Sequence, residues 1–76
     1  MGNCIIKNNI RRLRFDNNEM TQQELADKAS VTRQAIISIE KGTYYPSLEL
    51  AFRIARAFNV NVEEVFTFEE NNNIGV

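Results

Sequence analysis

The sequence has 76 residues, of which 43% are hydrophobic and 25% charged, a balance typical of one small globular domain spanning 1–76. With no histidine, one cysteine (Cys4) and three scattered glycines, it offers neither metal ligands nor a phosphate-binding loop, and we expect no enzyme, cofactor or metal site. The formal net charge is −1, but residues 1–58 hold all nine Lys and Arg against six Asp and Glu (+3), whereas residues 59–76 hold four Glu and no base (−4).

Residues 4–7 form a short β-like run, which needs a partner strand because so short a strand is not stable alone. Asn8 or Asn9 can cap the helix that follows. The polar residues 16–19 then form a turn. The first helix is therefore expected to follow Asn8 or Asn9 and to end before this turn.

Arg11, Arg12 and Arg14 make this first helix basic, which permits a positively charged contact face despite the net charge of the chain. The three arginines can form an ordinary solvated helix face. Alternatively, one of them is the partner in a structural ion pair and another approaches a phosphate group. Both interpretations stay open at this point.

Residues 21–41 predict two helices joined by a tight turn. Thr21 and Glu24 form a capping box, in which the Thr21 hydroxyl accepts from the Glu24 amide and the Glu24 carboxylate accepts from the Thr21 amide. Ser30 lies in the turn, and Thr32 caps the second helix. This arrangement is that of a helix-turn-helix motif.

The second of these helices has two chemically different sides on a helical wheel. One side is apolar, with Ala35, Ile36 and Ile39. The other side carries Arg33, Gln34, Ile37, Ser38 and Lys41. In the major groove arginine fits guanine, glutamine fits adenine, and an aliphatic group can meet the thymine methyl. We expect the first four of these residues to read DNA bases and Lys41 to hold a backbone phosphate.

Gly42 ends this helix, because glycine readily adopts the left-handed conformation found there. The hydroxyls of Thr43 and Tyr44 in the following loop are expected to contact phosphates, since such groups commonly bind backbone oxygens. The alternative for the aromatic residues is packing. We expect the ring of at least one of Tyr44 and Tyr45 to lie under the loop.

Ser47 caps a helix that runs to about Phe58 and is apolar over most of its circumference. So wide an apolar arc indicates a central helix contacted on several sides, with a second subunit as one of the contacts. Asn61 caps a short last helix, and residues 66–68 alternate like a strand that would pair with residues 3–7. Residues 69–76 are expected to be a frayed tail.

The run IRRLR…MTQQELADKASVTRQAIISIEKGTYYPSLELAFRIARAFNVNVEEVF resembles the Cro and lambda-repressor-type helix-turn-helix family, also called xenobiotic-response-element regulators. Several positions match at the right spacing: Gln22, Ala26, Val31, Ile36, Ile39, Glu40, Gly42 and Pro46-Ser47-Leu48. The resemblance implies an all-α domain of five helices whose second and third helices, residues 21–41, form the DNA-binding motif. The β-like segments at the two ends resemble those of the small dimeric cytolysin-operon-type repressors, in which they pair as an antiparallel ribbon. Here Ile6, Phe66 and Phe68 would attach that ribbon to the core.

The resemblance also assigns roles to particular residues. Thr21 and Gln22, at the start of the second helix, would lie near phosphate, and we include the cap Thr32 in the same set. Glu40 matches an acidic residue that forms a structural ion pair with an arginine of the first helix, here Arg14. Two positions depart from the family pattern: Ser30 stands where glycine is usual, and the loop over residues 16–19 is one residue longer.

These observations predict a sequence-specific transcriptional regulator, a repressor that binds a pseudo-palindromic operator in double-stranded DNA as a homodimer. Two recognition helices would enter successive major grooves about 34 Å apart. No signal peptide and no apolar run of about eighteen residues occur, so we expect a cytoplasmic protein without membrane contact. Because the chain has no domain large enough for a separate effector site, we expect no small-molecule effector. The alternative is a protein-interaction module of the same fold, such as an antitoxin or a bridging factor.

Overall fold

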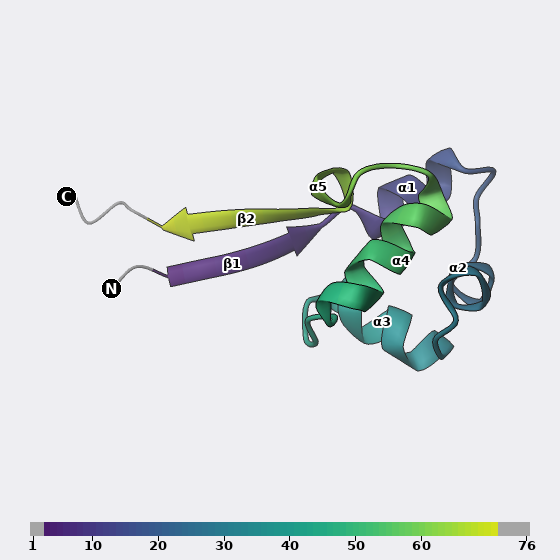
Figure 1. The fold of residues 1–76 in the computed structure, drawn as a ribbon, viewed down its shortest axis with the longest axis horizontal. Helices are drawn as coiled ribbons and strands as arrows, with labels where there is room; N and C mark the ends of the chain where they lie inside the picture. The colour runs from purple at the N-terminus through teal and green to yellow at the C-terminus, as the bar shows by residue number, and fades with distance from the viewer. Residues whose placement is uncertain (1–2, 72–76) are drawn as a thin grey trace.

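The computed structural model describes residues 3–71 and shows five helices packed into a body from which a two-stranded ribbon projects (Figure 1). The elements in chain order are β1 (Asn3–Asn8), α1 (Ile10–Asp16), α2 (Gln22–Ala29), α3 (Arg33–Lys41), α4 (Leu48–Phe58), α5 (Val62–Val65) and β2 (Phe66–Asn71). None of the helices in this range is both long and apolar enough to cross a membrane. The five-helix fold with a terminal ribbon confirms the predicted architecture.

Three helices begin at the capping residues that the sequence predicts. The Thr21 hydroxyl accepts from the Glu24 amide at 3.0 Å, and the Glu24 carboxylate accepts from the Thr21 amide at 2.8 Å, which completes the capping box. The hydroxyls of Thr32 and Ser47 each accept from the amide three residues later, at 3.1 Å. These local bonds fix where α2, α3 and α4 start.

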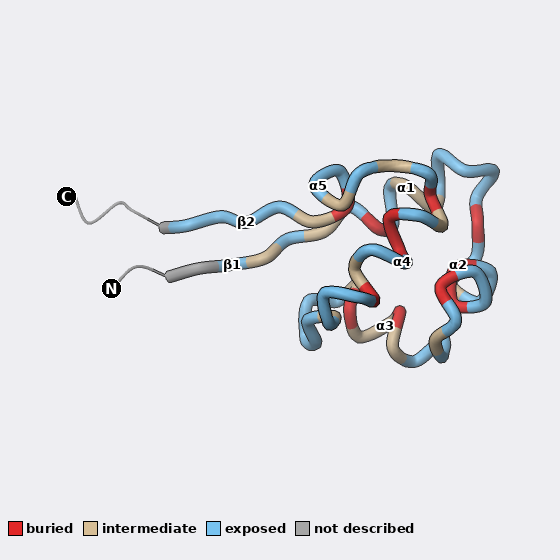
Figure 2. The backbone as a smooth tube through the Cα atoms, viewed as in Figure 1, coloured by how far each residue is buried: buried red, intermediate tan, exposed pale blue. Residues whose placement is uncertain are grey.

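The core lies where α1, α2, α3, α4 and α5 meet, and Figure 2 shows the buried positions gathered on the helical body. Its largest fully buried side chains are Ile10, Leu25, Ile36, Ile39, Ile54 and Val65. Helix α4 packs on both α2 and α5, and α3 packs on α2. This packing holds α3 in one orientation, with its apolar side inward.

The two departures from the family pattern have visible backbone consequences. Ser30, at the turn between α2 and α3, adopts the left-handed conformation with φ 60° and so does without the glycine that usually stands there. In the longer loop between α1 and α2, Asn18 and Glu19 both have positive φ, of 59° and 55°. These three residues adopt a conformation that is unfavourable for residues with a side chain, by about 1–2 kcal/mol each.

The ribbon is an antiparallel pair of β1 and β2 in which Ile6 lies opposite Phe68 and Asn8 opposite Phe66. The prediction that residues 69–76 are frayed is wrong for 69–71. These residues continue β2 because Asn3–Ile5 supply backbone partners, and Lys7 pairs with Glu69 at 3.2 Å. Residues 72–76 lie outside the described range.

The ribbon is attached to the core less extensively than predicted. Phe66 packs against the core and Ile6 is half-buried, but Phe68 is 65% exposed. Phe68 lies two residues beyond Phe66 on the same face of β2, where the strand has already left the helical body. The outer part of the ribbon therefore carries apolar side chains that the helical body does not cover.

Candidate nucleic-acid interface

Helix α3 presents the predicted base-reading residues on the side opposite the core. Ile36 and Ile39 are buried beneath the helix. Arg33 and Gln34 are exposed, and Ile37 and Ser38 are half-buried at the edge of the same surface. The inward and outward sides thus differ in exposure as the helical wheel predicts.

An ion pair between Arg14 and Glu40 fastens the last turn of α3 to α1. Two bonds join the guanidinium to the carboxylate, Nε to Oε1 at 3.0 Å and Nη2 to Oε2 at 2.9 Å. The third donor of the same guanidinium, Nη1, bonds to the backbone oxygen of Met20 at 2.9 Å. The two side chains are only 17% and 12% exposed, so this two-pronged contact is shielded from water. It is the pair that the family resemblance implies, and it gives Glu40 a structural role between α1 and α3.

Asn8 attaches the end of α3 to the start of α1 at a second point. From the sequence it was predicted only as a possible helix cap. The N-cap position of α1 is Asn9, whose side chain makes no capping bond, but the side-chain oxygen of Asn8 accepts from the Ile10 amide at 3.1 Å. The side-chain nitrogen of Asn8 donates to the backbone oxygens of Ile39 and Glu40, at 3.0 and 3.4 Å. Asn8 therefore provides hydrogen-bond donors for two carbonyls at the end of α3. Because the partner Ile39 lies 31 residues away, no local sequence pattern indicates this role.

The residues expected near phosphate at the start of α2 lie beside α3. Thr21 is exposed and its hydroxyl is the cap of α2. Gln22 is half-buried, and its side-chain nitrogen lies 3.5 Å from Oε1 of Glu40. The positive end of the α2 dipole, where backbone amides are available to an anion, is therefore next to α3.

Three of the other predicted phosphate residues, Thr32, Thr43 and Tyr44, line a shallow hollow of about 310 Å³ at another border of α3, whereas Lys41 does not. The lining residues of this hollow are Thr32, Gln34, Ala35, Ser38, Thr43 and Tyr44. The Thr43 hydroxyl donates to the Ser38 carbonyl at 3.2 Å, so a phosphate would compete with this bond. The expectation that one tyrosine ring packs under the loop is wrong, because Tyr44 and Tyr45 are 52% and 51% exposed.

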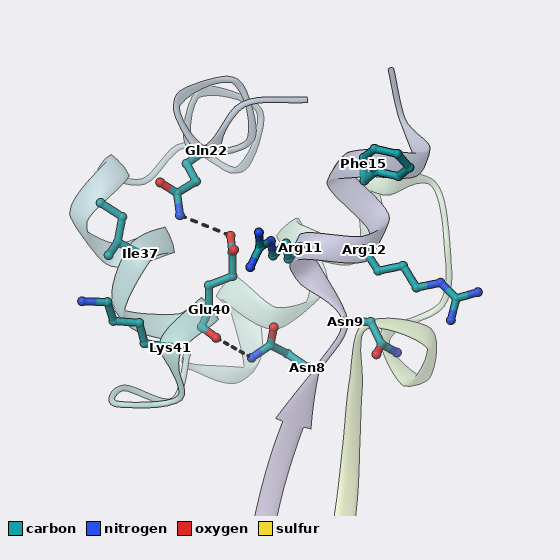
Figure 3. A pocket seen from close by; sticks show the side chains of 9 residues that line it. All are labelled: Asn8, Asn9, Arg11, Arg12, Phe15, Gln22, Ile37, Glu40 and Lys41. Atoms are coloured by element: carbon teal, nitrogen blue, oxygen red, sulfur yellow. Dashed lines mark hydrogen bonds between the residues drawn. The ribbon is translucent and has the colours of Figure 1, made fainter. Parts of the chain in front are cut away.

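A larger groove runs between α1 and α3, on the side of the recognition surface where Gln22 lies (Figure 3). It consists of two adjoining hollows of about 640 and 620 Å³ that share the lining residues Arg11, Phe15, Gln22 and Glu40. We call it the α1–α3 groove. Ile37 and Lys41 border the first hollow, and Thr21 and Arg33 border the second.

For Arg11, another residue of this groove, the sequence alone did not distinguish a solvated arginine from one that approaches a phosphate. Arg11 precedes Arg14 by three residues, so both lie on the same side of α1. That spacing was the available signal, but it becomes informative only once Arg14 is known to contact α3.

The donors gathered around α3 are guanidinium, amide, hydroxyl and ammonium groups, which suit the base edges and phosphates of a nucleic acid. Within residues 3–71, no cluster of three or more His, Cys, Asp and Glu side chains is placed to hold a metal ion.

Comparisons with known proteins support this interpretation. The helix-turn-helix family model matches residues 10–65. The chain is 48% identical over 66 residues to an uncharacterized HTH-type transcriptional regulator of Methanocaldococcus jannaschii, covering 87% of this chain and 98% of that protein. It is 36% identical over 61 residues to the HTH-type transcriptional activator BcrR of Enterococcus faecalis, covering 80% of this chain and 29% of BcrR. It is 32% identical over 63 residues to the cryptic phage CTXphi transcriptional repressor RstR of Vibrio cholerae, covering 83% of this chain and 56% of RstR.

Proposed function

Since the chain belongs to the helix-turn-helix family of Cro and lambda-repressor type, whose members are DNA-binding transcriptional regulators, we propose that it binds a pseudo-palindromic operator as a homodimer. Helix α3 enters the major groove, where its outward side chains contact bases. The observation that carries this proposal is the two-sided character of α3. Its outward side carries side chains that can contact bases, while its inner side is buried in the core and held to α1 by the Arg14–Glu40 ion pair.

Base reading requires that the helix present its side chains in a fixed position, and three contacts support this. The Thr32 cap fixes the first turn, while the Arg14–Glu40 pair and the Asn8 side chain fix the last. A helix held at both ends loses little additional conformational freedom when it binds, so more of the contact energy remains for discrimination between bases. In this arrangement Arg33 and Gln34 donate to purine edges, and Ile37 and Ser38 make the adjoining apolar and hydroxyl contacts.

Phosphate contacts on both borders of α3 would fix the position of the helix along the groove. On one border, Thr21 and Gln22 bring the amino-terminal end of α2 to the backbone, and Lys41 lies at the end of α3. The other border carries the hollow with Thr32, Thr43 and Tyr44. Contacts of this kind position the protein without selecting a sequence.

Exposed apolar side chains support the homodimer. Leu48 and Phe52 on α4 are 74% and 52% exposed, and Ile5 and Phe68 on the ribbon are 47% and 65% exposed. Large apolar groups of this kind on so small a protein favour a surface that a second protein covers. Two copies related by a two-fold axis would place their α3 helices about 34 Å apart, one turn of DNA.

The proposed sign of regulation is repression, which is the role stated in the name of RstR, whereas BcrR is named an activator. A reporter gene placed under the control of the operator, once that operator has been identified, tests directly whether the protein represses or activates. We expect reporter expression to fall when the protein is produced, and a rise would assign activation instead.

Selection of bound duplexes from a random DNA pool tests the proposal as a whole. The expected result is one short half-site repeated with two-fold symmetry, together with two protomers per duplex in sedimentation. A single asymmetric motif would contradict the homodimer. A monomer that binds no duplex even at low salt would contradict DNA binding, and would favour a protein-interaction module.

A further inference from the structure

Arg11 of α1 lies at the middle of the α1–α3 groove, where it lines both hollows. In Figure 3 its side chain points from α1 towards Gln22 and Glu40, whereas the neighbouring Arg12 points away from them. Arg12 instead lies within 3.9 Å of Asp16 on its own helix. Two adjacent arginines of one helix are therefore directed to different surroundings.

The groove is the most basic part of the surface around α3. Five basic side chains line it against two acidic ones: Arg11, Arg12, Arg14, Arg33 and Lys41 against Glu19 and Glu40. Since the whole chain has a formal charge of −1, this is a marked local concentration of positive charge.

The charge of Glu40 is paired with Arg14, and no ion pair joins Glu40 to Arg11 within residues 3–71. Arg11 makes no ion pair with any residue of 3–71, and in this range the same holds for Arg33 and Lys41. Arg33 and Lys41 stand eight residues apart, about 12 Å along the axis of α3. Arg11 lies on α1, on the other side of the groove from α3, and lines the hollow that contains Lys41 as well as the hollow that contains Arg33.

We propose that Arg11 binds a backbone phosphate, so that α1 is part of the DNA interface and one DNA strand runs along the α1–α3 groove. This inference rests on the proposed function, because the strand is the one that flanks the major groove entered by α3. Phe15, which is 68% exposed, lines both hollows together with Arg11. An arginine directed by its surroundings, with its donors free, suits a phosphate oxygen.

The test compares the salt dependence of DNA binding for Arg11→Ala with that of the matched control Arg56→Ala. Arg56 is an exposed arginine on α4 that does not line the groove, so both variants lose the same charge. The probe is a mixed-sequence duplex of about 20 base pairs, two turns of DNA, titrated by fluorescence anisotropy between about 50 and 200 mM salt. We expect Arg11→Ala to make the slope of log K against log salt less steep by about one for each protomer bound, about two for the homodimer, and Arg56→Ala to leave it unchanged.

Arg11→Lys separates loss of charge from a change in fold. Lysine keeps a charge that can meet phosphate, so the slope should return to the wild-type value. All three variants should unfold at the wild-type temperature, because Arg11 and Arg56 are both exposed. A slope for Arg11→Ala equal to that of wild type, or a slope that Arg11→Lys does not restore, would overturn the proposal.

Failure of this inference can be told apart from failure of the proposed function. If the wild type selects a symmetric operator and Arg11→Ala behaves like Arg56→Ala, only the phosphate contact of α1 is overturned. If the wild type binds no duplex, both are overturned. If Arg11→Ala loses affinity for one base sequence alone, Arg11 is a base contact and the phosphate assignment is wrong.

Discussion

The inner and outer sides of α3 each carry an isoleucine and a charged residue, but these are subject to opposite physical constraints on the two sides. On the inner side Ile36 and Ile39 are 0% and 2% exposed, and Glu40 is held by two bonds from Arg14. On the outer side Ile37 is half-exposed, and Arg33 has no ion-pair partner within residues 3–71. Isoleucine and a charged group occur on both sides, so residue type alone does not determine the role.

This contrast teaches that stability and recognition can be separated within a single helix of nine residues. Substitutions on the inner side should lower the free energy of unfolding, and DNA binding should fall only as the folded protein is lost. Substitutions on the outer side should change DNA binding and leave unfolding unaltered.

Ile36→Ala should have the largest effect. It removes a fully buried side chain from the centre of the core, and such truncations lower the free energy of unfolding by about 2–5 kcal/mol. Chemical denaturation measures this loss. Ile37→Ala is the matched control on the other side of the helix, and it should change stability by less than about 1 kcal/mol while weakening DNA binding. Equal destabilisation by the two variants would remove the distinction between the sides.

Glu40→Gln should destabilise the fold by about 2–3 kcal/mol, since it leaves the shielded Arg14 guanidinium without its counter-charge. The matched control is Glu49→Gln, which breaks an exposed pair with Arg53 within α4 and should cost less than about 1 kcal/mol. Thermal unfolding of both variants measures the difference. Similar losses would show that the Arg14–Glu40 pair behaves as an ordinary surface pair.

Arg33→Ala should leave stability unchanged and cost about 1–3 kcal/mol of binding at one base position. Measured against single-base variants of the operator, discrimination should vanish at that position and persist at the others. A loss of the same size on every sequence would make Arg33 a phosphate contact.

Lys41→Ala should have the smallest effect, a uniform weakening of binding with a salt slope less steep by about one for each protomer bound. Lys28→Ala is its matched control, because Lys28 is likewise exposed in the last turn of its helix, on α2. An unchanged slope for Lys41→Ala would exclude Lys41 from the phosphate contacts.

The helix starts were predictable because capping is local. Thr21, Thr32 and Ser47 each bond to an amide three residues away, and the sequence shows this spacing directly. The alternation at residues 66–68 likewise indicated a strand. The extension of β2 to Asn71 was not predictable, because residues 69–71 are polar and are held by partners more than sixty positions earlier.

The candidate site divides in the same way. The outward residues of α3 follow from helical periodicity, and the Arg14–Glu40 pair came from the family resemblance. The roles of Asn8 and Arg11 depend on how β1 and α1 pack beside α3, which no local pattern specifies. The exposure of both Tyr44 and Tyr45 is also a matter of tertiary packing, since the loop has no neighbouring element that covers their rings.

The central claim is that Arg33 on the outer side of α3 contacts a guanine edge directly, and chemical alteration of that base tests it most directly. In the selected operator, the guanine whose discrimination depends on Arg33 is replaced by 7-deazaguanine, which lacks the N7 acceptor but keeps its pairing with cytosine. The account predicts that wild-type affinity falls about tenfold, whereas Arg33→Ala, already without the donor, binds both duplexes equally. The same tenfold loss for wild type and Arg33→Ala, or no loss for either, would contradict a direct contact.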